Sequence, residues 1–139
     1  MPSEGVPSVI GACNDLLTFK CFVHGTPIAL GVDTGASCNL ISEKAYNQLK
    51  DLYNLHLLPA NTSLHSVQGT TLNVVGTVTL PLCLDVKSPI LQVTFFVTSG
   101  FALHCDGLLG LESLMMHNID VFPQKRAISL NGTHFAVIN

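Results

Sequence analysis

The chain has 139 residues, of which 47% are hydrophobic and only 11% are charged, and its formal net charge is -3. This length predicts a single domain over residues 1–139. Lysine and arginine total 6 and form no basic run, which excludes direct nucleic-acid binding as a function class. No apolar run reaches the roughly 18 residues of a membrane-spanning helix, so no membrane partner is expected.

The five cysteines are an odd number and form no Cys-x-x-Cys pair, which favours reduced thiols and a cytoplasmic protein. The first residues lack the basic start and apolar stretch of a signal peptide. We therefore interpret the two Asn-x-Ser/Thr matches, at Asn61 and Asn131, as coincidental. The six histidines have neither helical nor zinc-finger spacing, so no metal site is expected. No cofactor is expected either.

Short runs of Val, Ile, Leu, Thr and Phe, separated by Gly, Pro and Asn, predict a mostly β fold. The first two strands are expected over 17–23 and 28–32, joined by a turn, and this hairpin would deliver Asp33 to a loop. A short strand is expected over 38–41. A helix should follow from Ser42, because serine is a preferred helix N-cap.

The second half of the chain continues the pattern of short strands. Extended segments over 62–67 and 71–75, with Gln68-Gly69-Thr70 between them, predict a protruding hairpin. The further elements that we expect are strands over 77–84 and 90–97, a buried strand end at 108–110, a helix over 111–117, and a hairpin turning at 131–132 between 128–130 and 134–138.

One segment carries chemistry. Residues 31–37, Gly-Val-Asp-Thr-Gly-Ala-Ser, place an acid on a loop between two apolar strands. Gly35 lets the backbone turn tightly without a Cβ clash, so Asp33 would be held rigidly. Together with Asn-Leu-Ile-Ser at 39–42, this segment resembles the active-site segment of retroviral and retrotransposon aspartic proteases.

Further matches follow in the order of that family. Residues 106–114, Asp-Gly-Leu-Leu-Gly-Leu-Glu-Ser-Leu, resemble its apolar-apolar-Gly element and terminal helix, and residues 66–70 are similar to its flap. Residues 75–81 resemble the segment that follows the flap in gypsy-type retroelement proteases. The resemblance covers about 19–130. It implies a retropepsin-type acid protease half-barrel with a flap hairpin and one or two short helices, assembled as a homodimer.

The resemblance also implies roles for individual residues. Asp33 would be the catalytic carboxyl, and the hydroxyl of Thr34 would lock the two active-site loops across the dimer axis. The other loop residues with a supporting role would be Gly35, Ala36 and Ser37, and the flap and substrate-binding residues would be Val67, Gln68, Gly69, Thr70 and Leu108.

Two neighbouring residues are interpreted as structural. Asp106 precedes the apolar-apolar-Gly element without a following Thr, so we expect it to support the fold and not to act as a second catalytic acid. Cys38 has no neighbouring base in the sequence, so we expect a small buried side chain and not a nucleophile.

Peptide hydrolysis by carboxyl groups needs a water between two of them, one accepting its proton and the other donating to the carbonyl oxygen. The chain has one Asp-Thr-Gly, so a homodimer is expected. The predicted function is an aspartic endopeptidase that cleaves extended polypeptides, such as a retroelement Gag-Pol-type polyprotein, in the cytoplasm or in a retroelement particle. Two alternatives stay open: a catalytically inactive retropepsin-like dimerisation or binding module, and the protease domain of a cellular ubiquitin-receptor-type protein.

Overall fold

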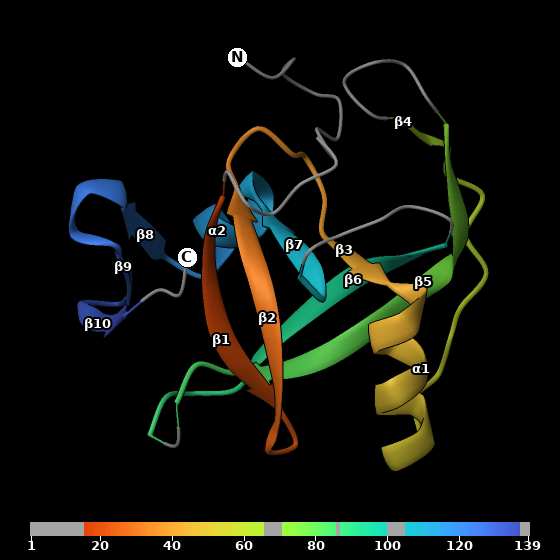
Figure 1. The fold of residues 1–139 in the computed structure, drawn as a ribbon, viewed down its shortest axis with the longest axis horizontal. Coiled ribbons are helices and arrows are strands. Elements are labelled where there is room, and N and C mark those ends of the chain that lie inside the picture. Colours follow the sequence, from red (N-terminus) through yellow and green to blue (C-terminus); the bar gives the residue numbers. More distant parts are fainter. Residues whose placement is uncertain (1–15, 66–70, 86, 100–104, 137–139) are drawn as a thin grey trace.

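The computed structural model describes residues 16–65, 71–85, 87–99 and 105–136. Strands dominate this part of the chain, and two short α-helices accompany them (Figure 1). In chain order the elements are β1 (Leu17–Val23), β2 (Thr26–Asp33), β3 (Leu40–Ser42), α1 (Glu43–Leu52), β4 (Leu64–His65), β5 (Thr71–Cys83), β6 (Leu91–Ser99), β7 (Gly107–Gly110), α2 (Leu111–Met116), β8 (Ile119–Phe122), the 3-10 helix η2 (Pro123–Lys125), β9 (Ala127–Leu130) and β10 (Thr133–Ala136).

The main sheet is 7-stranded, in the order β1-β2-β7-β3-β6-β5-β4, and β1 also pairs with β5. This extra pairing curls the sheet until it closes on itself. Buried and exposed side chains alternate along the strands, and the buried ones fill the interior. In β1, the side chains of Phe19, Cys21 and Val23 are buried, while that of Lys20 is exposed. The period of two explains both why the segment forms a strand and which face it buries.

The strands β2, β7 and β3 lie next to one another and position the loop that follows Asp33. β2 runs parallel to β7 with Asp33 opposite Gly110, and β7 runs antiparallel to β3 with Leu40 opposite Leu108. Gly107 has no room for a side chain, because the carbonyl oxygen of Leu40 occupies the place that a Cβ would take. The expected buried strand at 108–110 is confirmed.

A second, 3-stranded sheet has the order β10-β9-β8 and lies at the opposite end of the molecule from α1 (Figure 1). Its hairpin turns at Asn131 and Gly132, both with positive φ (50° and 89°), as the Asn-Gly pair predicts. Ile119 and Ile128 join this sheet to the main core. The expected helix after Ser42 is also confirmed: the Ser42 side chain accepts a hydrogen bond from the Ala45 N–H at 3.1 Å.

One expectation about strands was wrong. The segments 71–75 and 77–84 form one strand, β5, with a bulge between Val74 and Gly76. A Cβ on Gly76 would lie 2.5 Å from the carbonyl oxygen of Leu58, so this glycine marks a close approach of two backbones and not a strand end. Strand β8 was not predicted. The turn of the expected 62–75 hairpin lies outside the described residues.

Candidate active site

Asp33 is the last residue of β2, and only 4% of its surface is exposed. The N–H of Gly35 donates to the Asp33 Oδ1 at 3.0 Å, and the N–H of Ala36 donates to the Asp33 carbonyl oxygen at 3.1 Å. The loop therefore turns back on the acid that precedes it. The motif predicted that the loop would hold Asp33, and these hydrogen bonds fit that expectation, whereas the burial of Asp33 was not predicted. Its catalytic role stays a prediction.

The environment of Asp33 changes its acidity. Burial raises the pKa of the Asp33 carboxyl above its ordinary value of 3.8, while the N–H groups of Gly35 and Ala36 act in the opposite direction. Burial is the larger effect because it removes water from the charged form. A carboxyl with a raised pKa keeps a proton at a pH where an exposed aspartate has lost its own, and such a group can serve as a general acid.

The loop rests on the junction between β7 and α2. The N–H of Leu111 donates to the Ala36 carbonyl oxygen at 2.9 Å. A Cβ on Gly110 would lie 2.5 Å from the Cys38 carbonyl oxygen and 2.9 Å from that of Ala36. Only glycine fits at this junction without moving the backbone of the loop.

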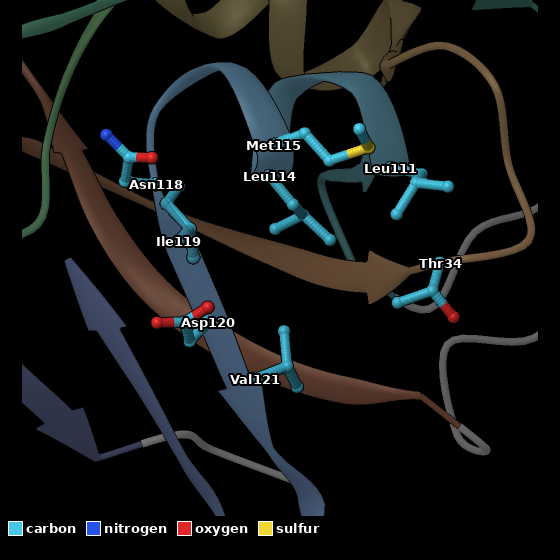
Figure 2. A pocket seen from close by; sticks show the side chains of 8 residues that line it. All are labelled: Thr34, Leu111, Leu114, Met115, Asn118, Ile119, Asp120 and Val121. Atoms are coloured by element: carbon cyan, nitrogen blue, oxygen red, sulfur yellow. The ribbon is translucent and has the colours of Figure 1, made fainter. Parts of the chain in front are cut away.

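Thr34 lines a hollow of about 430 Å³ beside the loop. Figure 2 shows that the other side chains around this hollow come from α2, from β8 and, for Asn118, from the turn between them. They are mainly apolar: Leu111, Leu114, Met115, Asn118, Ile119, Asp120 and Val121.

The remaining predicted site residues lie at different depths. Ala36 is buried with 1% exposure, and Ser37 faces a separate cleft of about 280 Å³. Leu108 is 1% exposed and packs with Leu40 beneath the loop, so its contact with substrate stays a prediction. The flap residues Val67, Gln68, Gly69 and Thr70 lie outside the described residues.

Asp106 supports the fold, as expected. Its Oδ2 accepts a hydrogen bond from the Ala29 N–H at 2.8 Å, and its own N–H donates to the Ala29 carbonyl oxygen at 2.9 Å. Its carbonyl oxygen accepts from the Ser42 N–H at 2.9 Å. These bonds connect β2 to the residues before β7 and to the start of α1.

Cys38 lies close to the acid but is not activated. Burial, together with the negative charges of Glu112 and Asp33, raises the pKa of its thiol to about 11. The thiol therefore stays protonated at neutral pH, which makes it a poor nucleophile. The expectation of reduced thiols was wrong for Cys105, which is disulfide-bonded. No three His, Cys, Asp or Glu side chains of the described residues form a group that could hold a metal ion. In the same part of the chain, no helix has the length and apolar character to cross a bilayer.

Sequence reasoning assigned no role to Asn39 or Ser113, and the structure places both directly behind the loop. Asn39 is 8% exposed, and its side chain reaches Ser113 and Gly110. A polar residue inside the otherwise apolar segment 38–41 was the one available signal. Its partners lie 71 and 74 residues away, so the sequence could not identify them.

The fold has solved relatives, although no protein-family model and no curated protein matches the sequence. The retroviral protease-like domain of Ddi1 from Leishmania major superposes with a TM-score of 0.69 at 15% identity, over 89% of this chain and 94% of that one. The EIAV protease complexed with the inhibitor HBY-793 gives 0.57 at 20% identity, over 78% and 94%. A retropepsin-like aspartic protease from Rickettsia conorii gives 0.50 at 19% identity, over 76% of each chain. These likenesses show a retropepsin-like fold.

Proposed function

We propose that this retropepsin-like chain is one subunit of a homodimeric aspartic endopeptidase that cleaves extended polypeptides. The observation that carries the proposal is the state of Asp33: a buried carboxyl with a raised pKa, on a loop fixed by β7 and α2. A second Asp33 from another copy of the chain would complete the pair. In aspartic proteases generally, two such carboxyls lie about 3 Å apart and share one proton.

The proposed reaction divides the work between the two Asp33 carboxyls. The ionised one accepts a proton from a bound water, whose oxygen attacks the peptide carbonyl carbon, while the protonated one donates its proton to the carbonyl oxygen. The pKa of Asp33 is already raised by burial in the single chain, and a second negative charge nearby would raise it further. The raised pKa lets one carboxyl of the pair keep its proton at a pH where an exposed aspartate has lost its own. The reaction uses no cofactor.

The proposed substrate is an extended polypeptide bound by strand-like backbone hydrogen bonds. We propose that Val67, Gln68, Gly69 and Thr70 close over it as a flap and exclude water. The finer proposal is the processing of a polyprotein of the retroelement Gag-Pol type, supported by the likeness to the EIAV protease. The likeness to the Ddi1 domain supports a second candidate, the protease domain of a cellular ubiquitin-receptor-type protein.

A mixed peptide library tests the activity directly. The library is incubated with the protein from acidic to neutral pH, and the products are read by mass spectrometry. We expect internal cleavage that a transition-state analogue of peptide hydrolysis abolishes, and the residues around the cleaved bonds would help to choose between the two candidate functions. Absence of cleavage from a protein that sedimentation shows to be dimeric would favour an inactive dimerisation module instead.

The second subunit should cover the face that carries Thr34. The two Asp33 side chains can meet only if the surfaces next to them also meet, and the hollow beside Thr34 lies on this face. Leu111 and Met115, which line it, are 42% and 68% exposed in the single chain. Exposed apolar side chains next to a half-complete site are what a partner surface requires.

Met115→Glu should therefore weaken the dimer and cleavage together. Met115 is largely exposed, so the folded single chain should tolerate the charge, whereas burying that charge in an interface is costly. The matched control is Met116→Glu. Met116 is the next residue and is 74% exposed, but it faces the separate cleft that contains Ser37 and Phe96 and not the hollow beside Thr34. Sedimentation at several protein concentrations, together with cleavage rates, measures both. If the Met115→Glu protein dimerises like the control, the face that carries Thr34 is not the dimer interface.

A further inference from the structure

We infer that Asn39 is a positioning residue, which holds the Asp33 loop in its working geometry through hydrogen bonds to β6, β7 and α2. The inference rests on the proposed function, since it concerns the same site. It assigns Asn39 no contact with substrate or with the reacting water.

The side chain of Asn39 connects three elements that are far apart in the sequence. Its Nδ2 donates to the Thr94 carbonyl oxygen of β6 at 2.9 Å and to the Ser113 Oγ of α2 at 2.7 Å. Its Oδ1 accepts from the N–H of Gly110, the last residue of β7, at 2.8 Å. An amide nitrogen has two hydrogens to donate, so both are used and the orientation of the side chain is fixed.

These bonds lead to the acid through the neighbouring backbone. Gly110, which Asn39 holds, pairs in register with Asp33 across β2 and β7. The next residue, Leu111, donates its N–H to the Ala36 carbonyl oxygen, and Ala36 donates its own N–H back to Asp33. At the other end of the loop, the Asn39 carbonyl oxygen accepts from the Phe96 N–H at 2.9 Å. The loop between Asp33 and Asn39 is thus held from both ends.

Removing the Asn39 amide should weaken the contact between the Asp33 loop and the β7–α2 junction more than it weakens the packing of the hydrophobic core. The Gly110 N–H and the Ser113 hydroxyl would lose their partner in a buried place, where an unsatisfied polar group is costly. The structure can relieve that cost by letting the loop and the β7–α2 junction move apart. Asp33 would then be displaced from the position that an attacking water requires, and small displacements of catalytic groups reduce rates strongly.

The kinetic test compares Asn39→Ala with Tyr53→Phe as a matched control. Tyr53→Phe also removes hydrogen bonds, to the Thr26 hydroxyl and the His24 carbonyl oxygen, at the opposite end of β2 from Asp33. For Asn39→Ala we expect kcat to fall about 10- to 100-fold with KM little changed. Tyr53→Phe should keep the wild-type kcat even though it is less stable.

Ser113 provides a milder pair of variants. Ser113→Ala keeps the bonds of Asn39 to Thr94 and Gly110 and should lower kcat less, so it also serves if Asn39→Ala does not fold. Ser113→Thr keeps a hydroxyl and should restore the rate. Combining Asn39→Ala with Ser113→Ala should cost less than the sum of the two single effects, because both act through one link.

Amide hydrogen exchange tests, without an activity assay, whether the hydrogen bonds of Asn39 hold the Asp33 loop in place. In Asn39→Ala, the N–H groups of Gly35, Ala36, Gly110 and Leu111 should exchange faster than the loss of global stability explains, and in Tyr53→Phe they should not. If exchange at these amides follows global stability alone, or if they loosen and kcat stays at the control value, the inference is overturned. A wild-type protein that cleaves nothing would defeat the proposed function, and the exchange result would still decide whether Asn39 holds the loop.

Discussion

Asp33→Asn should abolish peptide cleavage and, at neutral pH, raise the free energy of unfolding. The amide cannot accept a proton from water, and a single general acid or base typically contributes about 10²- to 10⁴-fold to the rate. In a homodimer the substitution removes both carboxyls at once. The Asn oxygen can still accept the hydrogen bond from the Gly35 N–H, so the loop should keep its geometry.

The stability effect follows from the raised pKa of Asp33. Because burial raises this pKa, the folded chain holds the proton more tightly than the unfolded chain does. The contribution of Asp33 to stability is therefore fully present below the unfolded pKa, near 3.8, and is lost as the pH rises through the folded pKa. Asp33→Asn has no such loss. Its advantage should be present at neutral pH and disappear at a pH below 3.8.

Denaturant unfolding at a series of pH values measures this difference, and the peptide library measures activity. Asp51→Asn is a suitable control, because Asp51 is an exposed aspartate at the end of α1 and its change also removes one charge. The control should keep activity and show no comparable gain in stability. Cleavage that survives in Asp33→Asn would place the chemistry on another residue, and a stability difference that does not vary with pH would contradict the burial of the charge.

Gly110→Ala should damage both the fold and the activity. The new Cβ would lie 2.5 Å from the Cys38 carbonyl oxygen and 2.9 Å from that of Ala36, and backbone atoms cannot move aside as a side chain can. Overpacking of this kind typically costs about 1–3 kcal/mol. The displaced segment begins three residues after Asp33, so kcat should fall as well.

Gly31→Ala provides the comparison for Gly110→Ala. Its Cβ would meet the side-chain methyl groups of Leu108 and Leu16 at 3.1 and 3.2 Å, and these flexible ends can give way. Urea unfolding and cleavage assays of the two variants should show a clearly larger loss for Gly110→Ala. Equal losses would mean that the contact between the loop and the β7–α2 junction is less rigid than its distances indicate.

The sequence allowed those parts of the fold to be predicted whose cause is local. A short run of apolar and β-branched residues before a turn predicted β1, the serine cap predicted the start of α1, and Asn131-Gly132 predicted the last turn. Strand β8 escaped prediction because it is short and contains an exposed aspartate, Asp120, so its pattern is weak. Local pattern could not show that Gly76 marks a close backbone approach within one strand, since Leu58 lies on a distant segment.

The candidate site also has a part that the sequence could predict and a part that it could not. The motif around Asp33 was readable because its residues are consecutive, although it did not predict that Asp33 is buried. The link through Asn39 was not readable, because it depends on how β6, β7 and α2 are packed together. A sequence can thus indicate which residue carries the chemistry, whereas the hydrogen bonds that hold it in place become visible only in the folded chain.

The central claim is that one chain holds half of an active site, and mixing subunits tests it most directly. Wild-type and Asp33→Asn chains are unfolded together in varying proportions, refolded at constant total concentration, and assayed for cleavage. If two Asp33 carboxyls are needed, activity should fall with the square of the wild-type fraction, because only pairs of wild-type chains carry both. A fall in direct proportion to the wild-type fraction would show that each chain works alone and would contradict the account.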